Sequence, residues 1–153
     1  MFDPIALQIG PFAIRWYALA YIAGIVLGWR LARRLMPAPP RAASPEQVDD
    51  FVTWVTLGII LGGRLGYVLF YRPGHYLAHP LEALMVWQGG MSFHGGALGV
   101  IVAAWIFTRR HGLDPLLFGD RVVMVVPIGL FFGRLANFVN GELYGRPVEG
   151  DFP

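Results

Sequence analysis

The sequence contains no cysteine and no lysine, and charged residues of either sign are sparse. The absence of cysteine excludes disulfides, thiolate metal ligands and a cysteine nucleophile belonging to this chain. All 12 basic residues are arginines, a bias that we do not interpret as functional. Charged residues make up 14% of the chain, whereas soluble domains carry about 25%. With 56% hydrophobic residues and a mean hydropathy of +0.53, the composition is typical of an integral membrane protein.

The charge balance points to membrane topology and not to nucleic acid as a partner. The net charge is +2 and the isoelectric point is near 9.3, and both come from arginines between the apolar segments. No stretch has the composition of a separate soluble domain. We therefore predict one membrane domain over residues 1–153.

Four apolar segments are long enough to cross a bilayer, whose ~30 Å core needs about 20 helical residues. They predict an all-α, polytopic helical bundle with about four transmembrane helices. Residues 1–14 are expected to form an irregular or interfacial lead-in, and residues 72–90 a loop or a shallow interfacial helix. Ser44 is the predicted N-cap of the second helix, with Pro45 at its first position. The four segments are Trp16–Trp29 with its flanking arginines, Phe51–Tyr71, Met91–Thr108 and about Arg121–Asn140.

The distribution of arginines predicts the orientation, because cytoplasmic loops are enriched in basic residues. The loops 30–50 and 109–121 contain seven arginines, and the opposite side contains Arg15, Arg72 and Arg146. The N-terminus should therefore lie outside, together with residues 72–90 and the segment after Asn140.

Glycines recur at four-residue spacing in every predicted span. This spacing lets helix backbones approach closely in lipid, so we interpret these glycines mainly as packing residues. The ladders are Gly24/Gly28, Gly58/Gly62/Gly66, Gly95/Gly99 and Gly129/Gly133.

Polar side chains from all four segments are expected at one depth. Arg64 and Arg134 each lie about 20 Å along their helix from the inner side, at 1.5 Å per residue. Tyr17 and His94 begin their segments from the outer side, and Asn137 follows Arg134 by less than one turn. Facing inward together, these residues would form a polar cavity in the outer leaflet. A charge at bilayer depth costs roughly 2.5–3.5 kcal/mol, so such residues usually have a partner or a function.

For three of these residues a structural interpretation stays open. For Arg64, a purely structural role is as well supported as a functional one, with a carboxylate or the carbonyls at a helix end as its partners. His94 is also consistent with an ordinary interfacial histidine, although the glycine pair after it would open space beside the ring. Tyr17 also fits the aromatic belt of membrane interfaces.

The residue types indicate phosphate chemistry. Guanidinium groups donate paired hydrogen bonds to phosphate and stay charged in a poorly solvated site. A histidine accepts a proton near neutral pH. Asn137 and Asn140 can hold hydroxyls or orient Arg134, and Glu142 can neutralise an arginine or hold a substrate donor. This combination predicts a lipid-phosphate enzyme whose nucleophile comes from a second substrate.

A second function class stays open beside the enzyme. Arginine-lined cavities also serve a membrane transporter or channel for an anionic solute. Such a path needs polar residues through both leaflets, and the inner halves Val122–Gly129 and Val100–Phe107 are almost purely apolar. No metal or nucleotide site is indicated, and no cofactor is expected.

Three longer motifs stand out in the chain. The longest and most specific runs from Gly133 to Glu142, with Gly145 following after two residues. The other two are Leu61-Gly-Gly-Arg64-Leu-Gly-Tyr-Val-Leu-Phe-Tyr71 and Gly89-Gly-Met-Ser-Phe-His94-Gly-Gly96. Together with Trp16-Tyr17, they resemble the prolipoprotein diacylglyceryl transferase family, and the resemblance extends over essentially the whole chain.

The resemblance implies a multi-pass enzyme of the bacterial plasma (inner) membrane with its active site facing the outer leaflet. It would transfer the diacylglyceryl group of phosphatidylglycerol to the lipobox cysteine of a preprolipoprotein signal peptide, releasing glycerol 1-phosphate. His94 would be the general base, Arg134 would hold the phosphate, and Tyr17 would be a further catalytic residue. Because the family is longer, we expect an N-terminal fragment with weak or no activity alone. The implied substrate-binding positions are Arg134, Asn137, Asn140, Glu142, Gly145 and Arg64.

Overall fold

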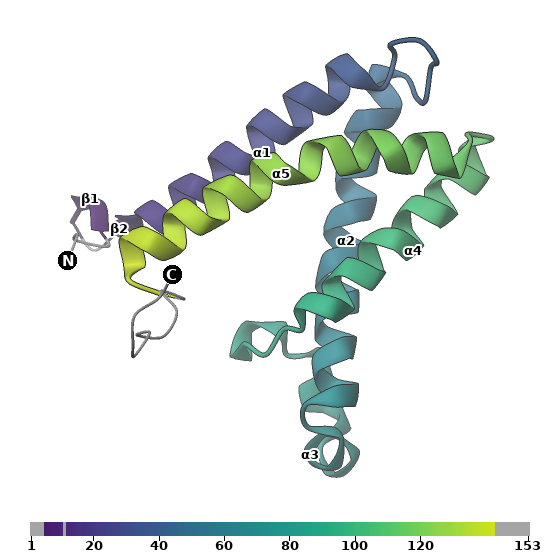
Figure 1. The fold of residues 1–153 in the computed structure, drawn as a ribbon. Helices are drawn as coiled ribbons and strands as arrows, with labels where there is room; N and C mark the ends of the chain where they lie inside the picture. The colour runs from purple at the N-terminus through teal and green to yellow at the C-terminus, as the bar shows by residue number, and fades with distance from the viewer. Residues whose placement is uncertain (1–4, 11, 143–153) are drawn as a thin grey trace, which may run out of the picture. The chain divides into compact units, whose positions relative to one another are not determined.

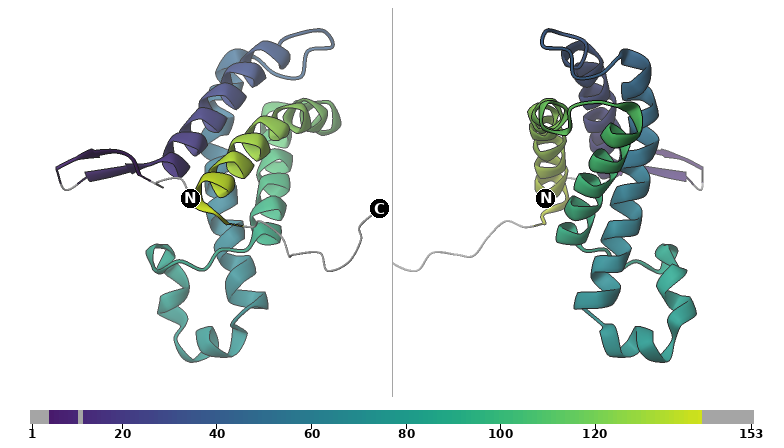
Figure 2. Two further views of the ribbon diagram at one scale, coloured as in Figure 1. Left: turned by 60° about the vertical axis from the view of Figure 1, so that its left-hand side comes forward. Right: turned by 90° about the vertical axis from the view of Figure 1, so that its right-hand side faces the viewer.

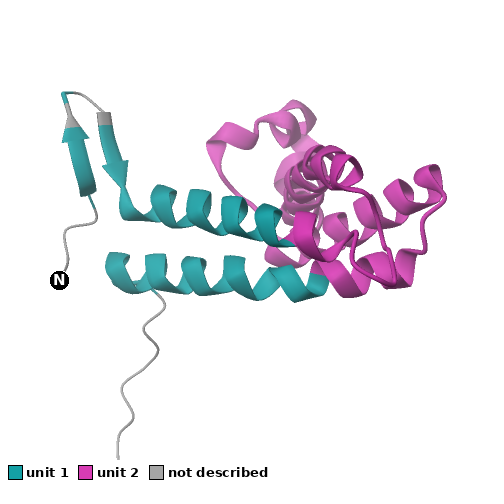
Figure 3. Ribbon diagram, turned by 90° about the horizontal axis from the view of Figure 1, so that it is seen from above, with its two compact units in different colours: residues 1–31, 123–153 teal, residues 32–122 magenta. Residues whose placement is uncertain are grey.

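The computed structural model describes residues 5–10 and 12–142 and is mostly helical. The chain divides into two compact units, coloured separately in Figure 3. Unit 1 comprises residues 1–31 and 123–153, and unit 2 comprises residues 32–122. The single membrane domain stays a prediction.

Unit 1 begins with a β-hairpin, so the expectation that this segment is irregular was wrong, whereas its interfacial position stays a prediction. Strand β1 (Ile5–Ile9) pairs antiparallel with β2 (Phe12–Arg15), and Ile9 stands opposite Phe12. Gly10 has a φ of +58°, a conformation that glycine adopts without steric cost. The two short runs on either side of this turn contain β-favouring residues, Ile5 and Ile9 in the first and Phe12 and Ile14 in the second.

The rest of unit 1 consists of two antiparallel helical segments, visible side by side in Figures 1 and 3. Helix α1 (Trp16–Leu35) contributes its residues up to 31, and α5 (Pro115–Asn140) contributes residues from 123 onward. A Cβ added to Gly24 would lie 3.4 Å from the Gly129 Cα, and one added to Gly28 would lie 3.0 Å from Val125. These glycines therefore pack helices, as predicted.

In unit 2, helix α2 (Pro45–Phe70) starts where the sequence indicated. The Ser44 hydroxyl accepts a hydrogen bond from the Gln47 N–H, and the Gln47 side chain accepts one from the Ser44 N–H. This reciprocal capping box satisfies two backbone donors at the helix start. Pro45 occupies the first turn, where its missing N–H costs nothing.

Helix α4 (Phe93–His111) packs antiparallel against α2 along the glycine ladders, and the two helices lie side by side in both views of Figure 2. A Cβ added to Gly58 would lie 2.6 Å from the Gly99 carbonyl oxygen. Another added to Gly66 would lie 2.8 Å from the Gly95 Cα. Such contacts are closer than real side chains tolerate, so the helix pair depends on glycine at these positions.

An aromatic core closes the opposite end of this helix pair. Phe107 and Phe118 are fully buried, and the Phe51 ring lies edge-on to Phe118 at a centroid distance of 4.9 Å. Phe118 comes from the first turn of α5, so three helices meet in this cluster. The buried members are Met36, Ala42, Ala43, Val48, Phe51, Phe107 and Phe118.

Helix α5 begins six residues earlier than predicted. The Asp114 carboxylate accepts hydrogen bonds from the N–H groups of Leu116 and Leu117, at 2.8 and 3.2 Å. This is an N-cap followed by proline at the first helical position, the same device as at Ser44. The prediction followed only the apolar run from Arg121 and missed this cap.

Between α2 and α4 the chain forms three short helical turns, so residues 72–90 are not an open loop. These are α3 (Pro73–Ala78), η1 (Pro80–Leu84) and η2 (Val86–Gln88). Several of their apolar side chains are strongly exposed, including Leu77 at 84% and Trp87 at 76%. The segment is compatible with the shallow interfacial position predicted for it.

Two of the four predicted spans are long and apolar enough to cross a membrane: α2 and α5. Within their apolar windows only 17% and 6% of the residues are buried. A core helix of a soluble protein would be mostly buried, so these helices expose apolar side chains as a lipid-facing helix does. The finding supports a membrane protein, and the total of four spans stays a prediction.

Candidate functional site

The residues predicted to form the site lie in both compact units, and the two groups are described in turn. Their convergence in one cavity stays a prediction. Gly145 lies outside the described residues. The other members are Tyr17, Arg134, Asn137, Asn140 and Glu142 in unit 1, and Arg64 and His94 in unit 2.

Arg134 stands on the last two turns of α5 with an exposed side chain. Over residues 5–10 and 12–142, its guanidinium has no hydrogen bond or ion pair. Its surroundings on the helix are apolar, since Phe131, Leu135 and Phe138 are also exposed. No described residue engages its donors, which are therefore available to an anion.

Asn137 and Asn140 follow Arg134 at intervals of three residues, so the three polar side chains form one stripe on α5. The Asn140 side-chain nitrogen donates to a Glu142 carboxylate oxygen at 3.5 Å, a long contact. The Asn140 side-chain oxygen is buried and has no donor among the described residues. Since a buried acceptor without a donor is costly, this oxygen is suited to a substrate hydroxyl.

The end of α5 explains why Glu142 lies beside this stripe. Gly141 has a φ of +68°, and its N–H donates to the Phe138 carbonyl at 3.2 Å. The Glu142 N–H donates to the Asn137 carbonyl at 2.8 Å. These two bonds form the Schellman ending, in which a left-handed glycine terminates the helix. The Asn-Gly-Glu sequence thus stops the helix and turns the carboxylate back toward Asn140.

Tyr17 forms its described contacts with Tyr21, one turn further along α1. The two hydroxyl oxygens are 3.1 Å apart, and the ring centroids are 4.8 Å apart. Either hydroxyl can be the donor of this bond. The pair is a polar contact near the start of α1, and Tyr17 is half-buried in it.

An apolar cavity of about 500 Å³ lies between the two helical segments of unit 1. Trp16 and Leu19 bracket Tyr17 on α1, and Leu135 and Ala136 directly follow Arg134 on α5. The polar stripe and the α5 side of the apolar cavity therefore belong to the same turns of α5. The lining residues are Ile5, Trp16, Leu19, Ala20, Ala23, Phe132, Leu135, Ala136 and Val139.

In unit 2, His94 is the second residue of α4, and its side chain is exposed. The Ser92 hydroxyl caps this helix by accepting a hydrogen bond from the Gly95 N–H at 3.2 Å. Gly95, directly after His94, packs its backbone on Gly62 and Gly66 of α2, so it serves the helix contact. The space expected beside the imidazole stays a prediction.

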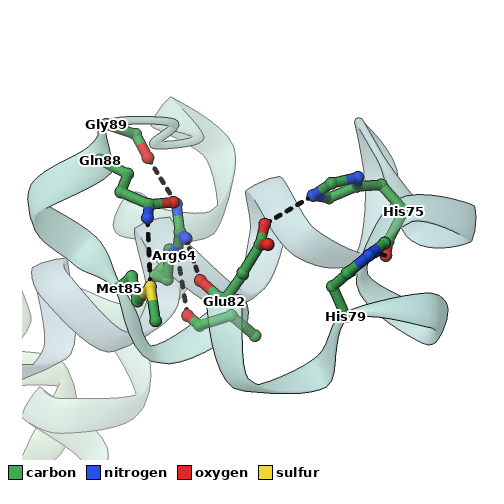
Figure 4. Close-up of polar contacts among 8 residues, drawn as sticks. Arg64, His75, His79, Glu82, Met85, Gln88 and Gly89 are labelled. Atoms are coloured by element: carbon green, nitrogen blue, oxygen red, sulfur yellow. Dashed lines mark hydrogen bonds and ion pairs between the residues drawn. The ribbon is translucent and has the colours of Figure 1, made fainter.

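Arg64 is 4% exposed and donates to four backbone carbonyls, as Figure 4 shows for the labelled partners. Its Nε donates to Ala83 at 2.9 Å, and one terminal nitrogen donates to Glu82 at 2.6 Å. The other terminal nitrogen donates to Gly89 and Gly90. All three nitrogens are therefore engaged by residues 82–90, which favours the helix-end-carbonyl interpretation of this arginine.

The same loop carries a second polar group that the sequence did not suggest. The His75 Nε2 lies 2.8 Å from a Glu82 carboxylate oxygen, and the His79 ring stacks on His75 at 5.0 Å (Figure 4). The Arg64 guanidinium also lies 5.3 Å from the Tyr76 ring centroid. The His75 and His79 side chains are both exposed, and each ring also has a partner within this loop.

Ser92 and the Schellman ending could have been found from the sequence. A serine directly before Phe-His-Gly at a helix start is an N-cap pattern, and Asn-Gly after an apolar run is a C-cap pattern. No local rule predicts the partners of Arg64, because they lie 18–26 residues away along the chain.

The family comparison covers nearly the whole chain. Residues 4–153 match the model of a family described as prolipoprotein diacylglyceryl transferase. Three relatives from different bacteria are all named phosphatidylglycerol–prolipoprotein diacylglyceryl transferase. One from Gluconacetobacter diazotrophicus is 64% identical over 152 residues, which is 99% of this chain and 54% of that protein. Another from Acidiphilium cryptum is 64% identical over 99% of this chain and 55% of its own length.

A third relative, from Paramagnetospirillum magneticum, is 66% identical over 144 residues, covering 94% of this chain and 54% of that protein. The chain thus spans about half the length of the curated relatives it matches. On the match over residues 4–153, which include every residue of the polar stripe, the chain belongs to the prolipoprotein diacylglyceryl transferase family.

Proposed function

We propose that this chain is part of an enzyme that transfers the diacylglyceryl group of phosphatidylglycerol to the lipobox cysteine thiol of a preprolipoprotein signal peptide. The carrying observation is the family match over residues 4–153. The names of the relatives describe a transferase and its two substrates, and they give no support to the anion-transporter alternative.

The unit 1 geometry supports a lipid phosphate as the ligand. Arg134 is exposed without a partner among the described residues, and Asn140 has an acceptor oxygen without a donor in the same range. Arg134 would hold the phosphate, and Asn137 and Asn140 would bind hydroxyls of the glycerol headgroup. Tyr17, Glu142 and Gly145 would complete the polar site. The adjoining apolar cavity suits the hydrocarbon part of the same molecule.

The reaction is a substitution at a glycerol carbon. The substrate thiol loses its proton to His94, and the sulfur forms a bond to the carbon that carries the phosphate oxygen. The carbon–oxygen bond breaks, and its electron pair leaves on glycerol 1-phosphate. Arg134 stabilises the charge that develops on this leaving group, which is the contribution expected of a donor held in place before the reaction.

The proposed setting is the bacterial plasma membrane, with four spans, the N-terminus outside and the site in the outer leaflet. The arginine distribution supports this orientation. Substituted-cysteine labelling tests it on intact cells. His79→Cys and Glu142→Cys should react with an impermeant reagent, and Arg41→Cys and Arg110→Cys should react only after permeabilisation. The reverse pattern would overturn the orientation.

The transfer itself is tested with the full-length protein that contains this chain. The protein is incubated with phosphatidylglycerol vesicles and a lipobox peptide, and the peptide is weighed by mass spectrometry. We expect a gain of one diacylglyceryl group, and no gain when the peptide carries serine in place of the cysteine. Vesicles of phosphatidylcholine alone should give no product. An unchanged peptide mass with phosphatidylglycerol would refute the proposal.

A further inference from the structure

Residues 89–92 connect the carbonyls that Arg64 binds to the start of α4, whose second residue is His94. The guanidinium binds the carbonyls of Gly89 and Gly90, and the chain then passes through Met91 and Ser92 into α4. We call residues 89–92 the lead-in of α4. Because a helix propagates from its first turn, the position of the lead-in decides where His94 stands.

The lead-in lies closely against one face of α2. The Ser92 N–H donates to the Gly63 carbonyl at 2.9 Å, and a Cβ added to Gly63 would lie 2.7 Å from the Met91 side chain. Gly90 has a φ of +81°, and a Cβ added there would lie 2.5 Å from the nearest atom of the Tyr67 ring. Three neighbouring residues of α2, at positions 63, 64 and 67, thus hold the lead-in.

We infer that Arg64 is a positioning residue, which fixes the lead-in and through it the place of the His94 imidazole, and that it does not bind the lipid phosphate. Its Nε and both terminal nitrogens already donate to carbonyls, and it is buried. A guanidinium fits this task because its planar fork reaches several acceptors at fixed angles. The kinetic part of this inference rests on the proposed function, and the geometric part does not.

The geometric part is tested by distance measurements on the full-length protein, since this chain has no cysteine of its own. Spin labels on Leu57→Cys and Phe93→Cys report the start of α4 relative to α2. Labels on Leu69→Cys and Val102→Cys report the helix pair itself. All four positions are exposed. In the Arg64→Lys variant we expect the first distance distribution to shift or broaden and the second to stay unchanged.

The kinetic part is tested in the same variant without labels. Lysine keeps the positive charge and loses the fork, so a phosphate-binding role and a positioning role predict different losses. We expect kcat to fall about 100-fold, the effect of misplacing a reacting group by about 1 Å. The KM for phosphatidylglycerol should stay within about twofold, because uniform substrate binding is unaffected. A raised KM with unchanged distances would overturn the inference and assign Arg64 to the phosphate.

A second variant displaces the lead-in and leaves Arg64 in place. Gly90→Ala brings a Cβ against Tyr67, whereas the matched control Gly74→Ala enters open space in α3. Gly90→Ala should reproduce both the altered distance and the fall in kcat, and Gly74→Ala neither. If Arg64→Lys does not fold, Gly90→Ala and Gly74→Ala decide the matter alone. A Gly90→Ala protein with the same distances and the same kcat as Gly74→Ala would refute the inference. The two parts can also fail separately. If the unsubstituted protein has no transferase activity but a variant still alters the first distance, the proposed function is refuted and the geometric role of Arg64 is upheld.

Discussion

Two arginines occupy the same position in helices of the same length, and their surroundings are opposite. Arg64 lies 19 residues after the first residue of α2, and Arg134 lies 19 residues after the first residue of α5. Both helices have 26 residues. Arg64 is buried with four carbonyl partners, whereas Arg134 is exposed and without a partner over the described residues.

The comparison teaches that the charge of a membrane arginine does not reveal its role. A buried guanidinium that is saturated by carbonyls contributes to stability, because removing it leaves those carbonyls unpaired. An exposed guanidinium with free donors contributes little to the fold and is available to a ligand. The following variants separate the two roles, from the largest expected effect to the smallest.

The largest effect is expected on stability, in Arg64→Ala. Two or more of its carbonyl partners should find no replacement, and each hydrogen bond to a charged group contributes about 1.5–3 kcal/mol, so the loss should be about 3–6 kcal/mol. Unfolding in detergent, followed by circular dichroism, measures it. Arg134→Ala is the matched control and should stay within about 0.5 kcal/mol. Equal losses in the two variants would remove the distinction.

The next effect is on activity, in Arg134→Ala. Losing a donor aimed at developing charge costs about 2.7–4 kcal/mol of activation free energy, or roughly 100- to 1000-fold in turnover. The lipobox-peptide assay measures the rate. Arg72→Ala, which removes an exposed arginine at the start of α3, should leave the rate unchanged. Normal turnover of Arg134→Ala would contradict the phosphate role.

A third pair of variants compares Gly62 of α2 with Gly129 of α5. In Gly62→Ala the new Cβ meets the Gly99 Cα at 2.8 Å, so overpacking should cost about 1–3 kcal/mol. In Gly129→Ala the Cβ meets nothing within 4 Å, so the higher helix propensity of alanine should leave stability unchanged or raise it by up to about 1 kcal/mol. Detergent unfolding of both variants gives the comparison. Equal stabilities of the two variants would show that α2 and α4 can move apart to accommodate the added methyl group without a loss of stability.

The smallest effect is expected in Ser92→Ala, which removes the side-chain cap of α4 and keeps the backbone bond to Gly63. Loss of a cap costs about 1 kcal/mol. If Arg64 holds the lead-in, turnover should fall far less than in Arg64→Lys. Threonine, which also caps, should restore the stability. A loss of turnover as large as that of Arg64→Lys would show that the cap, not the arginine, positions His94.

Local patterns predicted the helices well because helix signals are local. Ser44-Pro45 starts α2 as expected, and the glycine ladders of α2 and α4 pack as expected. The N-terminal hairpin was missed because its strands are short, and propensity alone decides little over so few residues. The start of α5 was missed because the capping rule was applied at Ser44 and not at Asp114.

Part of the local arrangement of the candidate site was predictable from the sequence, and the meeting of its residues in one cavity stays a prediction. The stripe of Arg134, Asn137 and Asn140 follows from helical periodicity, and the Glu142 turn follows from Asn-Gly. The cavity beside it was not predictable, because its lining depends on which faces of α1 and α5 meet.

The sequence by itself determined the membrane class, the helical segments, the packing role of the glycines in α1, α2 and α4, and the family. In α5, by contrast, a Cβ added to Gly129 or Gly133 would meet nothing within 4 Å. The properties that the sequence determined depend on composition and on neighbours within a few residues. Only the tertiary structure decided between the two interpretations of Arg64, because its acceptors come from a loop 18–26 residues away. A guanidinium binds phosphate and carbonyls with equal geometric ease, so the folding of the chain around it determines which of them it meets.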